Sequence, residues 1–190
     1  MAEVAHSEFI LGGQKSGKSR RAEALARAWL AASPDHRALL LATGLAGDAE
    51  MHERIARHRR DRAERVPGLQ TVEVPLHLGE ALREHSAPQT LVVVDCLTLW
   101  LTNALMPLQG PAADGATWAA QQADLLAALA RAPGPVVLVG NEIGLGVIPL
   151  GREVRAFVDA LGQLNQAVAA ACGRVTFMAA GLPLTMKDDT

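Results

Sequence analysis

The sequence lacks several features that would point to particular classes of protein. It has only two cysteines, Cys96 and Cys172, which are too few for a disulfide framework, and their spacing matches no metal-binding motif. No apolar run reaches the length of a membrane span, and the acidic N-terminal stretch MAEVAHSE is unlike a signal peptide. The net charge of −2 is far from the strongly basic balance typical of nucleic-acid-binding proteins. We therefore expect a cytoplasmic enzyme or switch that binds no nucleic acid and spans no membrane.

Nothing in the sequence divides the chain: it contains no internal repeat, low-complexity tract or interdomain linker, so residues 1–190 are expected to form one α/β domain. Short apolar runs alternate with helical patterns, as units of strand, helix and strand require. Because these runs are continuous rather than alternating, they predict a mostly parallel central sheet with helices on both faces. We expect strands at 9–11, 38–42, 71–74, 91–94, 136–139 and 175–179. We expect helices at 19–30, 48–65, 78–84, 96–105, 116–132 and 152–171.

The stretch FILGGQKSGKS at 9–19 carries the spacing G-x-x-x-x-G-K-[ST], which is typical of a P-loop that binds nucleoside triphosphates. Its glycines let backbone N–H groups approach phosphate oxygens, and the helix that follows adds the positive end of its dipole. Lys18 is expected to reach the β- and γ-phosphates, and the Ser19 hydroxyl to bind Mg²⁺. Further phosphate contacts are expected from the loop residues Gly12, Gly13, Gln14, Lys15, Ser16 and Gly17. The motif by itself names neither the reaction nor the acceptor.

Polar residues end two of the expected strands. Asp95 closes the run TLVVVD, at the edge where parallel sheets bind ligands and where P-loop enzymes hold Mg²⁺. An aspartate here is also a good N-cap for the following helix, but beside a P-loop we favour the metal role. Asn141 and Glu142 follow the next strand and are expected at the same edge. Spacing leaves two interpretations of this pair equal: contacts to water, metal or acceptor, or a turn capped by Asn141.

The segment MHERIARHRRDR at 51–62 surrounds His58 with arginines, and Ile55 lies on the same helix face. The common explanation of such a segment is a solvated helix face, and the segment taken alone favours it. The functional alternative is an anion site that holds a phosphate against an imidazole. Neutral imidazole is a competent nucleophile near pH 7, and neighbouring arginines would neutralise the phosphate.

These motifs, taken in order and spacing, resemble one family, the bifunctional adenosylcobinamide kinase/adenosylcobinamide-phosphate guanylyltransferases of cobalamin biosynthesis. The resemblance covers roughly residues 8–187, and its more specific blocks are RIARHR and GNEIGLGVIP. The matching blocks are ILGGQKSGKS, ATG at 42–44, EMHERIARHR at 50–59, VVVDCLTLWLTN at 92–103, VLVGNEIGLGVIP at 137–149, LGQLNQ at 161–166 and AGLPLTMK at 180–187.

The resemblance implies two successive reactions. ATP or GTP phosphorylates the aminopropanol hydroxyl of adenosylcobinamide, and GTP then transfers GMP to the new phosphate, giving adenosylcobinamide-GDP and pyrophosphate. In the family a histidine carries the GMP, and the matching residue is His58. Mg²⁺ dependence, a homotrimer and one antiparallel edge strand are also implied. By the same resemblance, nucleotide contacts fall on Ala42, Thr43, Gly44, Arg59, Arg60, Asp61, Arg62, Glu73 (at the guanosine) and Asp95, and metal contacts on Ser19 and Asp95.

The sequence departs from the family pattern after His58. The family usually has Arg-Pro soon after His-Arg and then a Trp before Thr-x-Glu, whereas here Ala63 follows Arg62 and Leu69 stands at the Trp position.

Two functions other than the bifunctional enzyme stay open. One is a P-loop kinase for another small alcohol, in which His58 is idle. The other is a nucleotide-dependent switch with 141–151 as its mobile segment. Of the three, only the bifunctional enzyme predicts GMP bound covalently to the chain.

Overall fold

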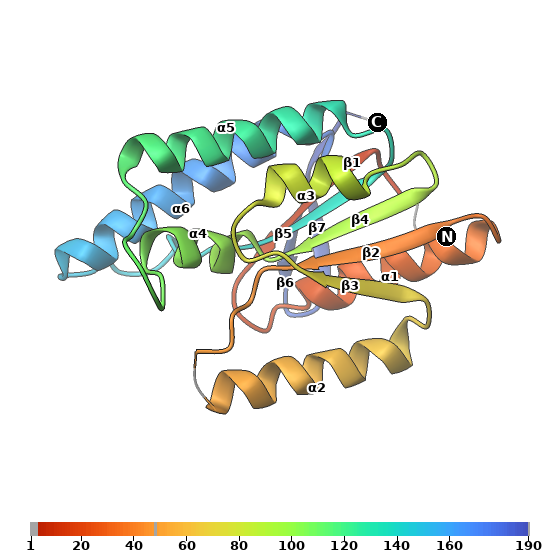
Figure 1. Cartoon of the computed structure of the whole chain (residues 1–190), viewed down its shortest axis with the longest axis horizontal. Helices are drawn as coiled ribbons and strands as arrows, with labels where there is room; N and C mark the ends of the chain where they lie inside the picture. Colours follow the sequence, from red (N-terminus) through yellow and green to blue (C-terminus); the bar gives the residue numbers. More distant parts are fainter. Residues whose placement is uncertain (1–3, 48, 190) are drawn as a thin grey trace.

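A computed structural model describes residues 4–47 and 49–189 of the chain. Seven strands form one sheet in the order β3-β2-β4-β5-β1-β6-β7, and all neighbouring pairs are parallel except β6 and β7 (Figure 1). The strands are β1 Ser7–Gly12, β2 Arg37–Ala42, β3 Leu69–Glu73, β4 Thr90–Asp95, β5 Val136–Asn141, β6 Arg174–Ala179 and β7 Leu182–Asp188. All six strands expected from apolar runs are therefore confirmed, and β7 is the antiparallel edge strand that the resemblance implied.

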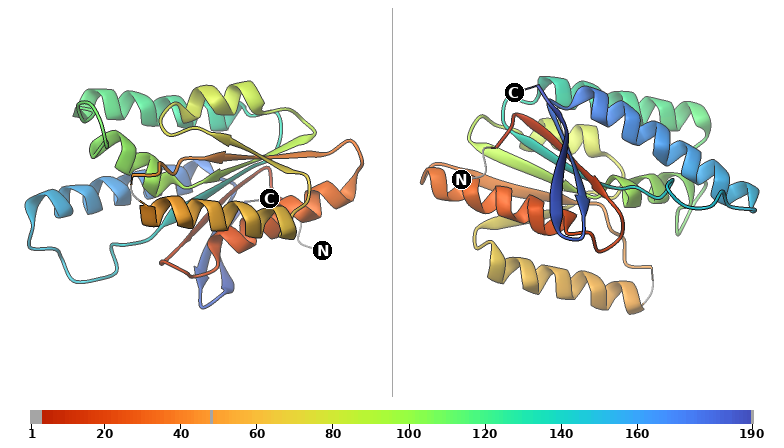
Figure 2. Two further views of the ribbon diagram at one scale, coloured as in Figure 1. Left: turned by 60° about the horizontal axis from the view of Figure 1, so that its bottom comes forward. Right: turned by 180° about the vertical axis from the view of Figure 1, so that it is seen from behind.

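Helices cover both faces of the sheet, as expected from strands that are apolar on both sides. Helices α1 and α2 lie on one face, and α3 to α6 lie on the other (Figures 1 and 2). The helices are α1 Lys18–Ala32, α2 Ala49–Arg65, α3 Leu78–His85, α4 Leu97–Leu105, α5 Gly115–Arg131 and α6 Arg152–Ala171. All six expected helices are present, although Asp48, the expected first residue of α2, lies outside the described residues. No helix in the described part of the chain is both long enough and apolar enough to span a membrane.

Two buried clusters fill the space between sheet and helices. The larger one joins side chains of the sheet to α3, α4, α5 and α6, with Trp100 and Phe9 among its largest fully buried members. The smaller one joins the opposite face of the sheet to α1 through Ile10, Leu25 and Val93. Successive strand residues therefore alternate between two apolar cores, which explains why the strand sequences are apolar throughout.

The parallel register brings the carboxyl ends of five strands to one edge of the sheet. Gly12 of β1 pairs with Asn141 of β5, and Asp95 of β4 pairs with Ala42 of β2, which in turn pairs with Glu73 of β3. Segments distant in sequence, including the P-loop after β1 and the segment after β5, therefore start side by side at this edge. This is the edge at which open α/β sheets bind their ligands.

Lys187 of β7 links the edge strand to the end of α6. Its Nζ donates to the carbonyl oxygens of Ala169 (3.4 Å), Ala170 (3.1 Å) and Cys172 (2.7 Å), which lie where a helix leaves carbonyls without partners. We expect Lys187→Met to lower the free energy of unfolding by about 1 kcal/mol, because the methionine keeps the apolar stem and removes these bonds. Urea denaturation measures the change, and Lys187→Arg should retain most of the stability. A midpoint in Lys187→Met equal to that of the wild type would show that these bonds do not stabilise the fold.

Candidate active site

The P-loop runs from the end of β1 to the start of α1, and neighbouring backbone sets its shape. A Cβ atom on Gly12 would lie only 2.4 Å from the carbonyl oxygen of Met178, so no larger residue fits without a shift of the strands. Gly17 has φ of +103°, and a Cβ there would lie 3.2 Å from Gly181 Cα in the turn between β6 and β7. The turn also donates a hydrogen bond from Gly181 N to the carbonyl of Ser16 (3.0 Å). The β6–β7 turn therefore closes one side of the P-loop.

The start of α1 is suited to an anion. Gly17 caps the helix without a side-chain hydrogen bond, and the first turn contains no acidic residue. Free N–H groups and the helix dipole then face the loop, which favours bound phosphate. Gly13, Gln14 and Lys15 complete the loop. Gln14 and Lys15 are exposed, and Lys15 has a positive φ of 56°.

Lys18 is buried in the P-loop, with only 8% of its surface exposed. Its Nζ donates to the carbonyl of Gly13 (2.5 Å), so the ammonium group is folded back over the loop. Burial lowers the pKa of Lys18, and the negative charge of nearby Asp95 acts in the opposite direction. A buried ammonium group with a lowered pKa is stabilised by an anion beside it, and triphosphate is the anion that a P-loop accommodates.

Ser19 and Asp95 meet across the site, as the metal hypothesis requires. The hydroxyl of Ser19 donates to Oδ2 of Asp95 over 2.8 Å, although the two residues are 76 positions apart in sequence. Hydroxyl and carboxylate oxygens are ligands that Mg²⁺ prefers. No group of three or more His, Cys, Asp or Glu side chains in the described residues could hold a metal by itself. The pair therefore fits a Mg²⁺ ion that keeps waters and phosphate oxygens as its other ligands.

A cavity of about 430 Å³ opens between α2 and β3. It brings together three residues of the predicted nucleotide set: Arg59 and Arg62 of α2 and Glu73 at the end of β3. Arg59 and Glu73 form an ion pair, and Arg62 donates to the Thr71 hydroxyl (3.4 Å). The remaining lining residues are Ala63, Leu69 and Thr71. Ala63 and Leu69 are the residues at which the sequence departs from the family pattern, so these departures lie in the wall of the cavity.

Arg62 connects the cavity to the P-loop side of the molecule. Burial lowers its pKa, while the charges of Asp95 and Glu23 act in the opposite direction. Glu23 lies on α1, and it pairs with Arg65 (3.2 Å) and with Arg62 (3.9 Å). Ion pairs and a hydrogen bond thus connect α2 to α1 and to β3. Sequence analysis missed Glu23, because within RRAEALARA it reads as a residue on the exposed side of a helix.

The other predicted residues of α2 lie outside the lining of the cavity. Asp61 pairs with Arg65 within the same helix (3.6 Å), and Arg60 is exposed. His58 is also exposed on α2, one turn before Arg62. Ile55, which shares the face of His58, is half-buried and lies near Gly44, where a Cβ would be 3.9 Å from the Ile55 side chain. The Ile55 side chain therefore lies near the strand-end loop at Gly44, and His58, three residues further along the helix, is exposed.

Thr43 is fully buried, and its polar groups already have partners. Its hydroxyl donates to the carbonyl of Cys96 (2.7 Å) and accepts from the backbone N–H of Cys96 (2.8 Å). Its own N–H donates to Asp95 O (3.2 Å), and its carbonyl accepts from Asn103 Nδ2 (2.7 Å). These bonds fix the turn that carries Asp95. Among the predicted set, the half-buried neighbours Ala42 and Gly44 are more accessible to a nucleotide than the Thr43 side chain.

Asn141 and Glu142 form a turn beside the P-loop. The backbone of Asn141 is held from two helices, because its N–H donates to Thr98 Oγ1 (2.9 Å) and its carbonyl accepts from Asn165 Nδ2 (3.1 Å). The N–H of Glu142 donates to Gly12 O (3.1 Å), and its carboxylate accepts from Gly144 N (2.5 Å). The structure thus has a turn here, closed by the side chain of Glu142, whereas the sequence predicted Asn141 as the cap. The alternative, contacts to water, metal or acceptor, stays a prediction.

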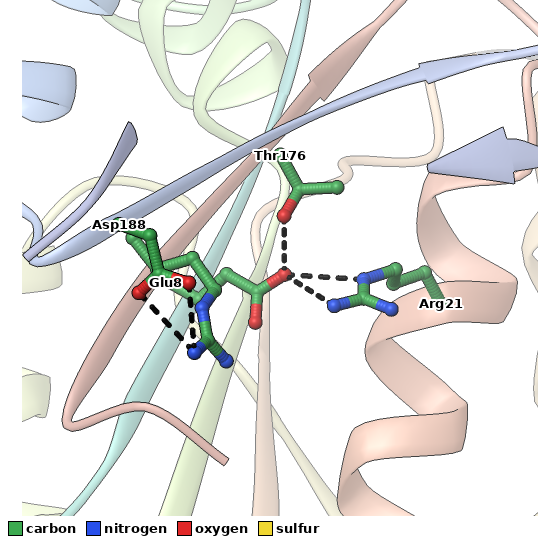
Figure 3. A network of polar contacts seen from close by, with 5 residues as sticks. Glu8, Arg21, Thr176 and Asp188 are labelled. Carbon is green, nitrogen blue, oxygen red and sulfur yellow. Dashed lines mark hydrogen bonds and ion pairs between the residues drawn. The ribbon is translucent and has the colours of Figure 1, made fainter. Parts of the chain in front are cut away.

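A buried carboxylate anchors α1 below the P-loop. Glu8 of β1 is fully buried, and its Oε1 accepts from Arg21 of α1 (3.0 and 3.1 Å) and from the hydroxyl of Thr176 of β6 (2.8 Å), as Figure 3 shows. An ion pair between Arg174 and Asp188 lies nearby (3.2 Å). Removing one partner of a buried pair leaves an uncompensated charge, so these bonds hold the P-loop helix firmly to two strands.

Comparisons with known proteins identify relatives of the chain and a protein of similar fold. The sequence profile of the family described as "Cobinamide kinase / cobinamide phosphate guanyltransferase" matches residues 8–186. The chain is 46% identical to the "Bifunctional adenosylcobalamin biosynthesis protein CobP" of Pseudomonas aeruginosa, over 96% of this chain and 98% of that protein. It is 37% identical to the corresponding CobU protein of Escherichia coli, over 94% and 98% of the two chains. The crystal structure of the flagellar accessory protein FlaH from Methanocaldococcus jannaschii superposes with a TM-score of 0.54 over 98% of this chain and 80% of that one. At 11% identity, this superposition shows the fold alone.

Proposed function

Because the chain belongs to the cobinamide kinase/cobinamide phosphate guanyltransferase family, we propose that its P-loop edge holds the nucleotide in both reactions of that family. The enzyme is a cobinamide kinase and cobinamide phosphate guanylyltransferase. The observation that carries the residue assignment is the Ser19–Asp95 hydrogen bond beside the buried Lys18. This combination supplies a cation for phosphate oxygens and two oxygen ligands for a divalent ion at one point of the sheet edge.

In the kinase reaction, the acceptor is the aminopropanol hydroxyl of adenosylcobinamide, and ATP or GTP is the donor. The hydroxyl oxygen bonds to the γ-phosphorus and its proton passes to solvent, the bond from that phosphorus to the β–γ bridging oxygen breaks, and the nucleoside diphosphate leaves. Lys18 and the N–H groups of the loop neutralise and orient the phosphates, which is the main work of a protein in phosphoryl transfer.

We assign Mg²⁺ to the oxygens of Ser19 and Asp95, which fit it by donor type and by their 2.8 Å separation. When bound, the ion would neutralise charge on the phosphate oxygens. Removal of divalent ions with EDTA should stop both reactions, and added Mg²⁺ should restore them.

In the guanylyltransferase reaction, His58 is the proposed carrier of GMP. A ring nitrogen of neutral His58 bonds to the α-phosphorus of GTP, and pyrophosphate leaves. The phosphate of adenosylcobinamide phosphate then displaces the histidine from that phosphorus, which yields adenosylcobinamide-GDP. Arg59 and Arg62 on the same helix are proposed to neutralise charge near the nucleotide, and Glu73, which lines the same cavity and pairs with Arg59, is the proposed contact to guanosine.

The test is to supply purified protein with Mg²⁺, adenosylcobinamide and nucleotide, and to identify the products by mass. With ATP we expect adenosylcobinamide phosphate, and with GTP we expect adenosylcobinamide-GDP together with pyrophosphate. Formation of the phosphate alone would contradict the guanylyl transfer and leave a kinase. Nucleotide hydrolysis with no modified acceptor would favour a switch.

We further propose that the enzyme is a cytoplasmic homotrimer. The edge strand β7 supports self-association, because Leu182, Leu184 and Met186 are each more than 60% exposed along this strand. Both cysteines are free and buried, which suits a reducing compartment. Light scattering on the purified protein should give three times the 20.0 kDa chain mass, and a monomer mass would contradict the trimer.

A further inference from the structure

The segment between β5 and α6 exposes an unusual amount of apolar surface. Leu145 is 81% exposed, Val147 is 96%, Ile148 is 77% and Leu150 is 97%. The stretch 143–151, IGLGVIPLG, contains no charged or polar side chain. Contiguous exposed apolar side chains on a folded protein mark a surface that binds something.

Hydrogen bonds hold this segment at the P-loop edge. At its start, Glu142 N donates to Gly12 O of the P-loop strand (3.1 Å), and the Glu142 carboxylate accepts from Gly144 N. At its end, Arg155 of α6 donates to the carbonyls of Pro149 and Leu150. In Figure 2 the segment projects from the molecule where β5 ends, as the blue-green link to α6. Its apolar side chains therefore start next to the triphosphate site.

The β6–β7 turn and the cavity between α2 and β3 differ from this segment in how open or how charged they are. The β6–β7 turn closes one side, through Gly181 and its bond to Ser16. The cavity between α2 and β3 lies further along the same edge, beyond β5, β4 and β2, and carries the charges of Arg59, Arg62 and Glu73. Among the described surroundings of the P-loop, the β5–α6 segment is the side that is both open and uncharged.

We propose that residues 143–150 bind the corrin ring of the acceptor, so that its side arm reaches the P-loop. This inference rests on the proposed function. The reacting hydroxyl must come within about 3.5 Å of the transferred phosphorus, while the macrocycle that carries it is much larger than the arm. The ring therefore lies on surface next to the P-loop. A corrin ring presents methyl groups and neutral amides, which match an apolar and uncharged surface rather than the arginines of α2.

The test compares a polar double variant, Val147→Asn with Ile148→Asn, with an apolar control, Val147→Ile with Ile148→Val. Three quantities are measured for each: KM for adenosylcobinamide in the kinase reaction, KM for ATP, and the GMP label that the protein acquires from GTP without acceptor. We expect the polar variant to raise the acceptor KM about tenfold or more, because it removes apolar contacts made by the bound acceptor. The KM for ATP and the label should change less than about threefold, and the control should resemble wild type.

Other outcomes overturn the inference. An unchanged acceptor KM in the polar variant would show that the ring binds elsewhere. A fall in molecular mass of the polar variant, measured by light scattering, would assign the segment to contacts between copies of the chain. Both side chains are exposed, so the variant is expected to fold, and its thermal midpoint checks this. Failure of the proposed function would be distinct, since wild type itself would then modify no acceptor.

Discussion

Replacing Lys18 with methionine is expected to lower kcat/KM of both reactions by roughly two to three orders of magnitude, because it removes a positioned cation from the phosphates. The ammonium group is buried and lies 2.5 Å from Gly13 O, inside the loop that would surround the phosphates. Methionine retains the length and the apolar stem of lysine, so the loss would report the charge. The measurements are phosphoryl transfer to adenosylcobinamide, and GMP transfer from GTP to adenosylcobinamide phosphate supplied directly.

The stability of this variant distinguishes a lost function from a lost fold. Burial lowers the pKa of Lys18, which means that the folded protein without nucleotide disfavours the charged form. Removing that charge should therefore not reduce the thermal midpoint of the nucleotide-free protein. The control is Arg20→Met, which removes an exposed cation from the same helix and should leave both activities within about threefold. If Lys18→Met lost kinase activity alone, the second reaction would need a separate phosphate site.

The strands and the P-loop were predictable because their signals are local. A run such as LVVV at 91–94 must be buried on both sides, and one loop spacing is enough to predict a loop between a strand and a helix that is suited to phosphate. The Ser19–Asp95 contact was also predictable although it is long-range, because parallel strands bring their carboxyl ends to one edge. The antiparallel β7 was implied only by the family resemblance, since LPLTMKD has no continuous apolar run.

The supporting contacts were not predictable, because tertiary packing decides them. Asn103 sits in the apolar helix LTLWLTNAL, and only the fold shows that its amide donates to Thr43 O and Pro75 O. Glu23 and Glu8 read as ordinary charged residues, yet both are buried against arginines of other elements. Thr43 stays a predicted nucleotide contact, and in the structure its hydroxyl is engaged by Cys96. We therefore expect Thr43 to contribute to the site by holding the turn that positions Asp95.

Replacing His58 with alanine is expected to separate the two activities. In the proposed mechanism the kinase reaction uses the P-loop residues and Asp95 but not His58, so it should stay within about threefold of wild type. Guanylyl transfer should fall by roughly four orders of magnitude or more, because the variant lacks the proposed nucleophile, which would divide the reaction into two displacements. His58 is exposed on α2, so its loss should leave the fold intact, and the thermal midpoint checks this.

The measurement is to incubate the protein with Mg²⁺ and GTP labelled at the α-phosphate, denature it, and count label on the chain. Wild type should carry label that acid releases, as expected of a phosphorus–nitrogen bond, and His58→Ala should carry none. His52→Ala is the matched control, since His52 is an exposed histidine of the same helix and should leave labelling unchanged. Label that survived in His58→Ala would move the nucleophile to another residue. Wild type that bound GTP but acquired no label would exclude a covalent intermediate, and any GMP transfer would then have to occur by direct attack of the acceptor phosphate on GTP.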